Sequence, residues 1–160
     1  MSAKRKKFDF KKQLEIGQQG EHIFMERYPH KLTIHPGYDG DFIDSKGRKI
    51  ELKTDQWCMD TETSNFFIER YSDFWKKTPG SFWQAYEHGC DIFCYMFVRN
   101  DTYFKFTNIE AVLEVLNKHI EDTKGRFIMI KNKGWQTAGF TIPREKLEDY
   151  YEVYTWKEEK

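Results

Sequence analysis

Apolar and polar residues alternate with a helical period in some segments of the chain and with a strand period in others. Residues 9–28 carry apolar side chains three and four positions apart, which predicts a helix that ends before Pro29. Residues 108–119 show a second helical stripe. Shorter helices are expected at 81–89, where Ser81 would cap the first turn, and at 144–151, where Pro143 would begin the helix.

Short apolar or alternating runs between these helices predict strands. Residues 91–98 are nearly all apolar, as in a strand that is covered on both faces. The order of elements indicates an α/β (α+β) domain whose central mixed sheet is flanked by helices. The helix at 81–89 joins two apolar strands, which favours a parallel crossover there. The expected strands are 31–35, 41–44, 49–53, 65–71, 91–98, 103–106, 127–131 and 135–142.

The segment 38–54, YDGDFIDSKGRKIELKT, has the pattern of a β-hairpin, with a glycine in a short polar turn between two strands. Side chains alternate between the two faces of a strand. Ile50 and Leu52 therefore point to one face, and Glu51 and Lys53 point together to the other.

The expected pairing places Asp41, at the opening of the first strand, beside Glu51. Two carboxylates about 4 Å apart repel by roughly 4 kcal/mol at an effective dielectric constant near 20, so they must be solvated, share a proton or hold a cation. Asp39 has the same strand parity as Asp41 and is the alternative. Glu21 falls in phase with the apolar stripe of the first helix, where a carboxylate is costly unless it is paired or bound to metal. Otherwise Glu21 lies at the edge of that stripe and reaches water.

The composition fits one folded domain of 160 residues, with 32% charged and 18% aromatic residues. No apolar run approaches the ~18 residues that a membrane span needs. The N-terminus lacks the apolar region of a secretory signal, and the three cysteines form no CxxC pair. We therefore expect an intracellular, cytoplasmic protein without membrane contact and without a small-molecule cofactor.

Charge is unevenly distributed, although the whole chain has a formal net charge of zero. Residues 1–12 carry six basic residues against the single acid Asp9, a net charge of +5, which leaves −5 for the remainder. We expect a basic arm, residues 1–12, joined to a single domain, residues 13–160. Such an arm either binds an anionic polymer such as DNA or is a solvated terminus. Its basic residues are Lys4, Arg5, Lys6, Lys7, Lys11 and Lys12.

A helix bearing an acidic residue, then an aspartate, nine intervening residues and Glu51-Leu52-Lys53 resembles the core of the PD-(D/E)XK nuclease superfamily. The spacing is similar to that of its phage-type endonucleases, the Holliday junction resolvase-like branch. Segments 63–69 and 139–143 are also similar to a phage-associated branch. Gly40 stands where that motif has a proline. The resemblance covers roughly residues 10–150 and implies a restriction-endonuclease-like core.

The resemblance implies a Mg²⁺-dependent deoxyribonuclease, an endonuclease on branched or structured DNA that acts in recombination, repair or phage DNA processing. For a phage protein the location would be the host cytoplasm. Asp41, Glu51 and the Leu52 main-chain carbonyl would hold Mg²⁺, or Mn²⁺ in its place, and Glu21 would complete the site. Lys53 would orient or deprotonate the attacking water, or stabilise charge on the phosphate.

Other assignments stay open at the level of sequence. Glu69 either reaches the site from its strand or pairs with a basic residue such as Arg70. Gln84 either contacts the scissile strand or is solvated. Three tryptophans lie near polar or basic stretches and either stack on unpaired bases or pack in the core: Trp57, Trp75 and Trp83.

Two alternative functions share this fold: an exonuclease or nicking enzyme, and a DNA-binding accessory protein that has lost catalysis. A homodimer would place two active sites on opposite DNA strands.

Overall fold

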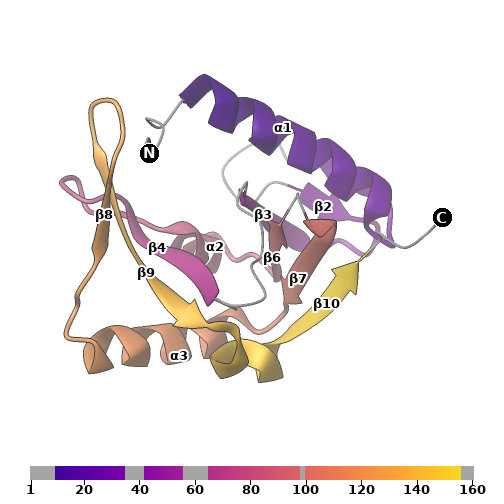
Figure 1. Ribbon diagram of the computed structural model, residues 1–160. Coiled ribbons are helices and arrows are strands. Elements are labelled where there is room, and N and C mark those ends of the chain that lie inside the picture. Colours follow the sequence, from indigo (N-terminus) through magenta and orange to yellow (C-terminus); the bar gives the residue numbers. More distant parts are fainter. Residues whose placement is uncertain (1–9, 35–41, 56–64, 98–99, 156–160) are drawn as a thin grey trace.

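The computed structural model describes residues 10–34, 42–55, 65–97 and 100–155, although not the side chains of residues 10–17 or 55. The described residues form two β-sheets, three α-helices and a 3₁₀ helix (Figure 1). Among them, no helix combines the length and apolar character that a membrane crossing requires. The elements are α1 (Phe10–Arg27), β1 (Leu32–Ile34), β2 (Phe42–Asp44), β3 (Lys49–Asp55), β4 (Asn65–Asp73), β5 (Thr78–Pro79), α2 (Ser81–Glu87), β6 (Ile92–Phe97), β7 (Thr102–Phe106), α3 (Ile109–Asp122), β8 (Ile128–Lys131), β9 (Gln136–Pro143), η2 (Arg144–Tyr150) and β10 (Tyr151–Thr155).

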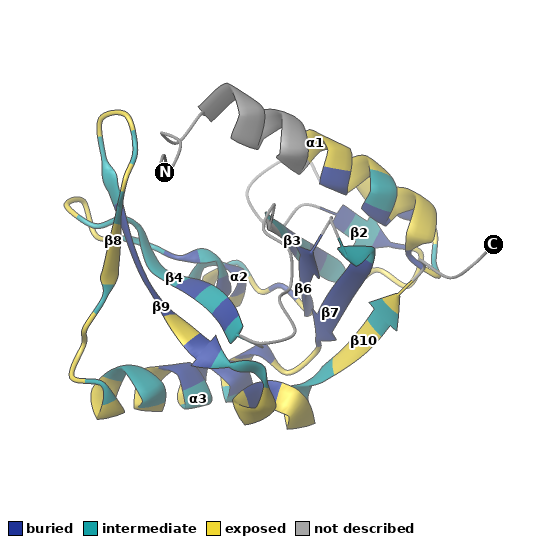
Figure 2. Cartoon of the chain, viewed as in Figure 1, coloured by how far each residue is buried: buried dark blue, intermediate teal, exposed yellow. Residues whose placement is uncertain are grey.

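The first sheet is mixed and has the strand order β1-β2-β3-β6-β7-β10. Its β3 and β6 pair in parallel, with Glu51 opposite Phe93 and Lys53 opposite Tyr95. The other neighbours in this sheet are antiparallel. All six residues of β6 are buried, which confirms a strand covered on both faces (Figure 2). The mixed α/β class and the mixed central sheet are therefore confirmed.

A second, antiparallel sheet was not predicted. Its strand order is β5-β4-β9-β8, so β4 belongs to this sheet and not to the central one, and it pairs with β9. The expected parallel crossover is found with a different partner, because β6 lies beside β3 and not beside β4. Apolar character alone could not distinguish the two partners, since both strands bury apolar side chains.

Helix α1 covers one face of the central sheet. Phe24 and Tyr28 are buried there in one cluster with Ile50 and Leu52 of β3. The helix approaches β3 closely at Gly20, where an added Cβ atom would lie 2.6 Å from the Thr54 side chain. The expectation that Glu21 belongs to the buried stripe was wrong, because Gly20 takes that position and Glu21 is exposed.

The opposite face of the central sheet packs against the second sheet and helices α2 and α3. Phe66 of β4 lies at the centre of this core, with its ring 5.0 Å from the rings of Tyr95 and Phe104 and 5.8 Å from that of Phe106. Aromatic contacts of this kind add to the free energy gained from apolar burial. The abundant aromatic residues of this chain therefore join the two sheets.

Two predicted helices differ in detail from the structure, one in its N-cap and the other in its type and its end. Gly80, not Ser81, is the N-cap of α2, and no side chain caps that helix. The segment after Pro143 is a 3₁₀ helix that ends at Tyr150, where β10 begins and pairs with β7. Strand β10 was not predicted, because the helix expected at 144–151 covered its first residue and the strand is short.

The turn between β2 and β3 is organised by the Asp44 carboxylate, which is 4% exposed. Its Oδ1 accepts hydrogen bonds from the main-chain N–H groups of Lys46 and Arg48, and its Oδ2 lies 2.8 Å from a guanidinium nitrogen of Arg48. Burial opposes ionisation of Asp44, but the hydrogen bonds from Arg48 and Lys46 outweigh it and lower the carboxyl pKa. This network fixes the register in which Phe42 pairs with Ile50.

Replacing Asp44 with asparagine should reduce the free energy of unfolding by about 2 kcal/mol, because charge-assisted hydrogen bonds are lost in a buried turn. A lowered carboxyl pKa gives stability that is complete above the unfolded pKa near 3.9 and is lost as pH falls towards the folded pKa. Urea unfolding of D44N and wild type at pH 7 and pH 3 measures both effects. The difference between them should shrink at pH 3. The exposed Asp122, paired with Lys118 at 3.4 Å, gives the matched control D122N, which should change stability by less than about 0.5 kcal/mol. Equal losses in the two variants would contradict the role of Asp44.

Candidate active site between the two sheets

Strand β3 sends alternate side chains to opposite sides of the central sheet. Ile50 and Leu52 are buried beneath α1, whereas Glu51 and Lys53 are partly exposed on the other face. That face carries Phe93 and Tyr95 of β6, which pair with Glu51 and Lys53 in register. The predicted division of β3 is therefore confirmed, and the Glu-x-Lys pair faces the space beside β4.

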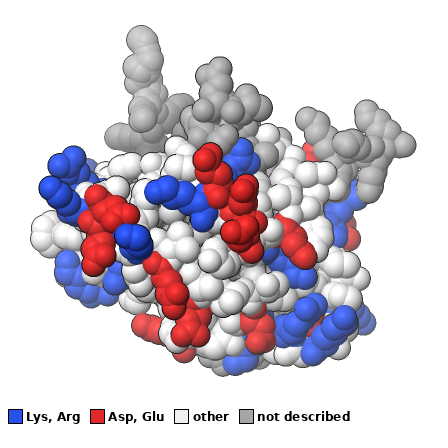
Figure 3. Space-filling model, turned by 90° about the horizontal axis from the view of Figure 1, so that it is seen from below, with Lys and Arg blue, Asp and Glu red and all other residues white. Residues whose placement is uncertain are grey.

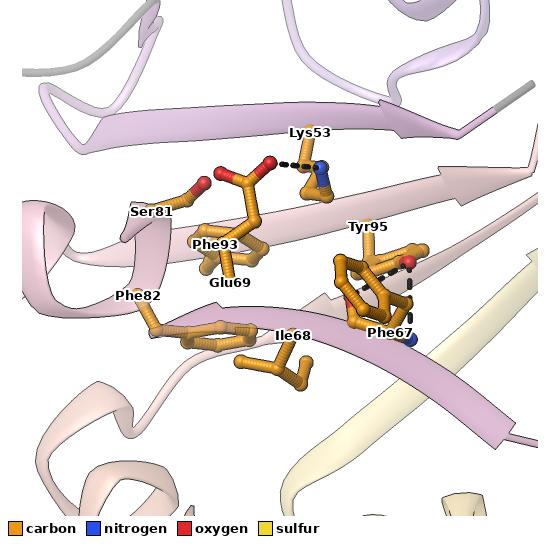
Figure 4. Close-up of a pocket in the computed structure, with 8 residues that line it drawn as sticks. All are labelled: Lys53, Phe67, Ile68, Glu69, Ser81, Phe82, Phe93 and Tyr95. Carbon is orange, nitrogen blue, oxygen red and sulfur yellow. Dashed lines mark hydrogen bonds and ion pairs between the residues drawn. The ribbon is translucent and has the colours of Figure 1, made fainter. Parts of the chain in front are cut away.

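Glu69 of β4 reaches across this space to Lys53. Its Oε2 lies 3.7 Å from Lys53 Nζ, and the two side chains are 25% and 22% exposed (Figure 4). Arg70 is used elsewhere, since its guanidinium lies 4.4 Å from the ring centre of Tyr71 and 4.6 Å from that of Trp83. Glu69 thus pairs with a lysine and also contacts the predicted site, so the two sequence-based interpretations describe the same contact.

A small depression surrounds this ion pair. Its floor is apolar, with the rings of Phe82 and Phe93 stacked 3.8 Å apart. Figure 4 shows the Ser81 hydroxyl pointing towards the Glu69 carboxylate. Electrostatic interactions are stronger beside such an apolar wall than in open water. The depression is lined by Lys53, Phe67, Ile68, Glu69, Ser81, Phe82, Phe93 and Tyr95.

Strand β4 is held against the central sheet by main-chain contacts on both sides of Glu69. The Tyr95 hydroxyl donates to the Phe67 carbonyl at 3.1 Å and lies 3.4 Å from the Phe67 amide nitrogen. At Gly80 the backbone of α2 approaches so closely that an added Cβ atom would lie 1.7 Å from the Glu69 carbonyl oxygen. These contacts fix the strand position from which Glu69 meets Lys53.

The Gln84 side chain forms a hydrogen bond within the protein. Its side-chain nitrogen donates to the Pro79 carbonyl at 2.6 Å, just before α2. The amide therefore stabilises the connection from β5 to α2. Sequence reasoning offered only DNA contact or solvation for this residue.

Among the predicted site residues not yet placed, Glu21 is the one whose side chain the structure describes. Glu21 is exposed on α1, the helix that packs on the opposite face of the central sheet. Asp39 and Asp41 lie outside the described residues, although Phe42 pairs with Ile50 in the register that the prediction for Asp41 requires. Lys4, Arg5, Lys6 and Lys7 also lie outside the described residues, as do the side chains of Lys11 and Lys12.

The atoms near Lys53 include oxygen atoms, the type of ligand that a hard divalent cation binds. Glu51, Glu69 and the Leu52 main chain offer oxygen atoms, which Mg²⁺ and Mn²⁺ prefer. Within the described part of the chain, however, no three acidic, histidine or cysteine side chains converge as a metal site would require. The residues fit a metal only together with a further ligand, and Asp41 is the predicted one.

Comparison with models of known protein families gives no match for this chain, and no curated protein matches its sequence.

Replacing Gly80 with alanine should reduce the free energy of unfolding by several kcal/mol, because the new methyl group would overlap the Glu69 carbonyl and displace a strand. The neighbouring variant S81A removes a side chain that makes no capping hydrogen bond to α2, so it should change stability by less than about 0.5 kcal/mol. Thermal unfolding of both variants tests this. Similar melting temperatures for G80A and wild type would show that β4 and α2 separate at little cost.

Proposed function

We propose that this protein is a Mg²⁺-dependent deoxyribonuclease with a restriction-endonuclease-like core, which cleaves branched or otherwise structured DNA as a Holliday junction resolvase-like enzyme. One observation supports the proposal more than any other. Glu51 and Lys53 share one face of β3, and a carboxylate from a second sheet holds the lysine ammonium there. An acidic and a cationic group placed side by side suit the hydrolysis of a phosphodiester.

Each described residue has a distinct role in this proposal. Glu51 and the Leu52 carbonyl would hold the divalent cation together with Asp41. When bound, that cation lowers the pKa of a coordinated water and offsets charge on the phosphate. Lys53 would orient the attacking water or stabilise negative charge on the phosphate. Glu69 would position the Lys53 ammonium, and the apolar floor would exclude bulk water from one side.

An accessory DNA-binding protein without catalysis is the second candidate, and the same ion pair favours it. With Glu69 3.7 Å away, the Lys53 ammonium stabilises less of the negative charge that develops on a phosphate during cleavage, so the pair suits a protein that binds DNA through other residues and does not cut it. The distinction is experimental, because this candidate binds DNA independently of metal and cleaves none. An exonuclease or nicking enzyme would differ from the main proposal only in the DNA substrates it cleaves.

Changing Glu51 to glutamine should lower Mg²⁺-dependent cleavage at least about 100-fold, because a neutral amide is a poor ligand for a hard cation. The assay compares a four-way junction, a flap, a single strand and a linear duplex, each with Mg²⁺ and with EDTA. The exposed Glu110 in the first turn of α3 provides the matched control E110Q, which should cleave at the wild-type rate. DNA binding without cleavage in wild type would overturn the nuclease proposal and favour the accessory protein.

Changing Glu69 to glutamine should lower kcat about tenfold with little change in KM, because Glu69 acts through the position of Lys53. Stability should fall by no more than about 1 kcal/mol, as for other partly exposed ion pairs. In a K53A background the same change should have no further effect on kcat, which a double-mutant cycle measures. Equal effects of E69Q in both backgrounds would show that Glu69 acts independently of Lys53.

A further inference from the structure

Two hairpin turns lie side by side at one end of the second sheet: the β4–β5 turn, residues 73–78, and the β8–β9 turn, residues 131–136 (Figure 1). Trp75 is 70% exposed in the first turn. Its indole N–H donates to the side-chain oxygen of Gln136 at 2.9 Å, and the Phe74 main-chain N–H donates to the Gln136 carbonyl at 2.8 Å. We call this pair of turns, together with Arg70 and Tyr71, the two-turn surface.

The two-turn surface concentrates positive charge in a chain whose net charge is zero. It contains five basic residues and one acidic residue, Asp73. The Asp73 carboxylate lies 3.3 Å from the main-chain nitrogen of Lys76. By contrast, acidic and basic side chains are interspersed on the face that Figure 3 shows. Local charge of one sign suits an anionic polymer. The basic residues are Arg70, Lys76, Lys77, Lys131 and Lys133.

Aromatic rings and cations alternate on this surface. Lys77 Nζ lies 3.8 Å from the ring centre of Phe74, and the Arg70 guanidinium lies 4.4 Å from that of Tyr71. The rings of Phe74 and Trp75 meet edge to face, with centres 5.0 Å apart. The inner rings thus hold the cations in place, while the exposed Trp75 retains area for another flat group. Stacking rings beside cations are the means by which proteins bind unpaired nucleic-acid strands.

Strand β4 connects the two-turn surface to the candidate active site. Glu69 contacts Lys53, and Arg70 is the next residue along the strand. Trp75 lies six positions after Glu69 in the sequence, a distance of roughly 20 Å or less at the rise of a strand. A strand of nucleic acid held at Trp75 would therefore need about six nucleotides to reach Lys53.

We propose that the two-turn surface binds an unpaired DNA strand, with Trp75 stacking on a base and the surrounding lysines pairing with phosphates. The choice of DNA as the nucleic acid rests on the proposed function, whereas the binding itself needs neither metal nor cleavage. Five basic residues in and beside the two turns match a polyanion, whereas an apolar protein partner would leave their charges unpaired.

Fluorescence anisotropy of a labelled 20-nucleotide oligothymidylate in EDTA tests the proposal with the full chain. W75A should weaken binding of this single strand about tenfold, and W75F, which keeps an aromatic face without the indole N–H, should recover most of it. Binding of a 20-base-pair duplex should change less than twofold. K77A should lower the slope of log K against log salt by about 0.7, whereas K118A on α3 should leave it unchanged.

Unchanged binding by W75A, or an equal loss for single strand and duplex, would overturn the proposal. Circular dichroism of W75A and W75F shows whether both variants are folded, and the recovery by W75F separates stacking from structural damage. A different result would refute the nuclease proposal, namely that the wild-type protein cleaves no DNA. Binding that depends on Trp75 without any cleavage would leave the two-turn surface established and the proposed reaction refuted.

Discussion

The parallel pairing of β3 with β6 is the constraint on which the site depends. It holds β3 in the middle of a covered sheet, where a strand must send alternate residues into different environments. Ile50 and Leu52 are thereby fixed beneath α1, and a shift of one residue would bury Glu51 and Lys53 in their place. The free energy of the apolar core therefore places the Glu-x-Lys pair on the opposite face of the sheet.

The second wall of the site comes from a strand of the second sheet. Because β4 pairs with β9, it crosses above the Glu51 face and brings Glu69 to Lys53. The close approach at Gly80 and the Tyr95 hydroxyl bonded to Phe67 hold it there. The same strand then continues into the turn that exposes Trp75. A single strand thus links the candidate chemistry to the surface proposed to hold the DNA.

Local pattern was sufficient for most elements and insufficient for their long-range partners. The helical stripe before Pro29, the hairpin around Asp44 and the apolar run of β6 are properties of neighbouring residues, so the sequence predicts them correctly. The partner of β4 depends on packing between distant residues, which periodicity does not encode. For the same reason the sequence predicted the face of Lys53 but could not choose Glu69 as its partner, and it placed Glu21 on a buried stripe that Gly20 occupies instead.

The proposed reaction requires that a divalent cation binds on the Glu51 face of β3. Titrating the isotopically labelled protein with Mn²⁺ and recording the loss of backbone amide signals in NMR spectra tests it directly, because the paramagnetic ion broadens only nearby signals. We expect substoichiometric Mn²⁺ to remove the signals of residues 51–53 and 69 first, and excess Mg²⁺ to restore them. Broadening centred elsewhere, or the same broadening in a variant without the Glu51 carboxylate, would contradict it.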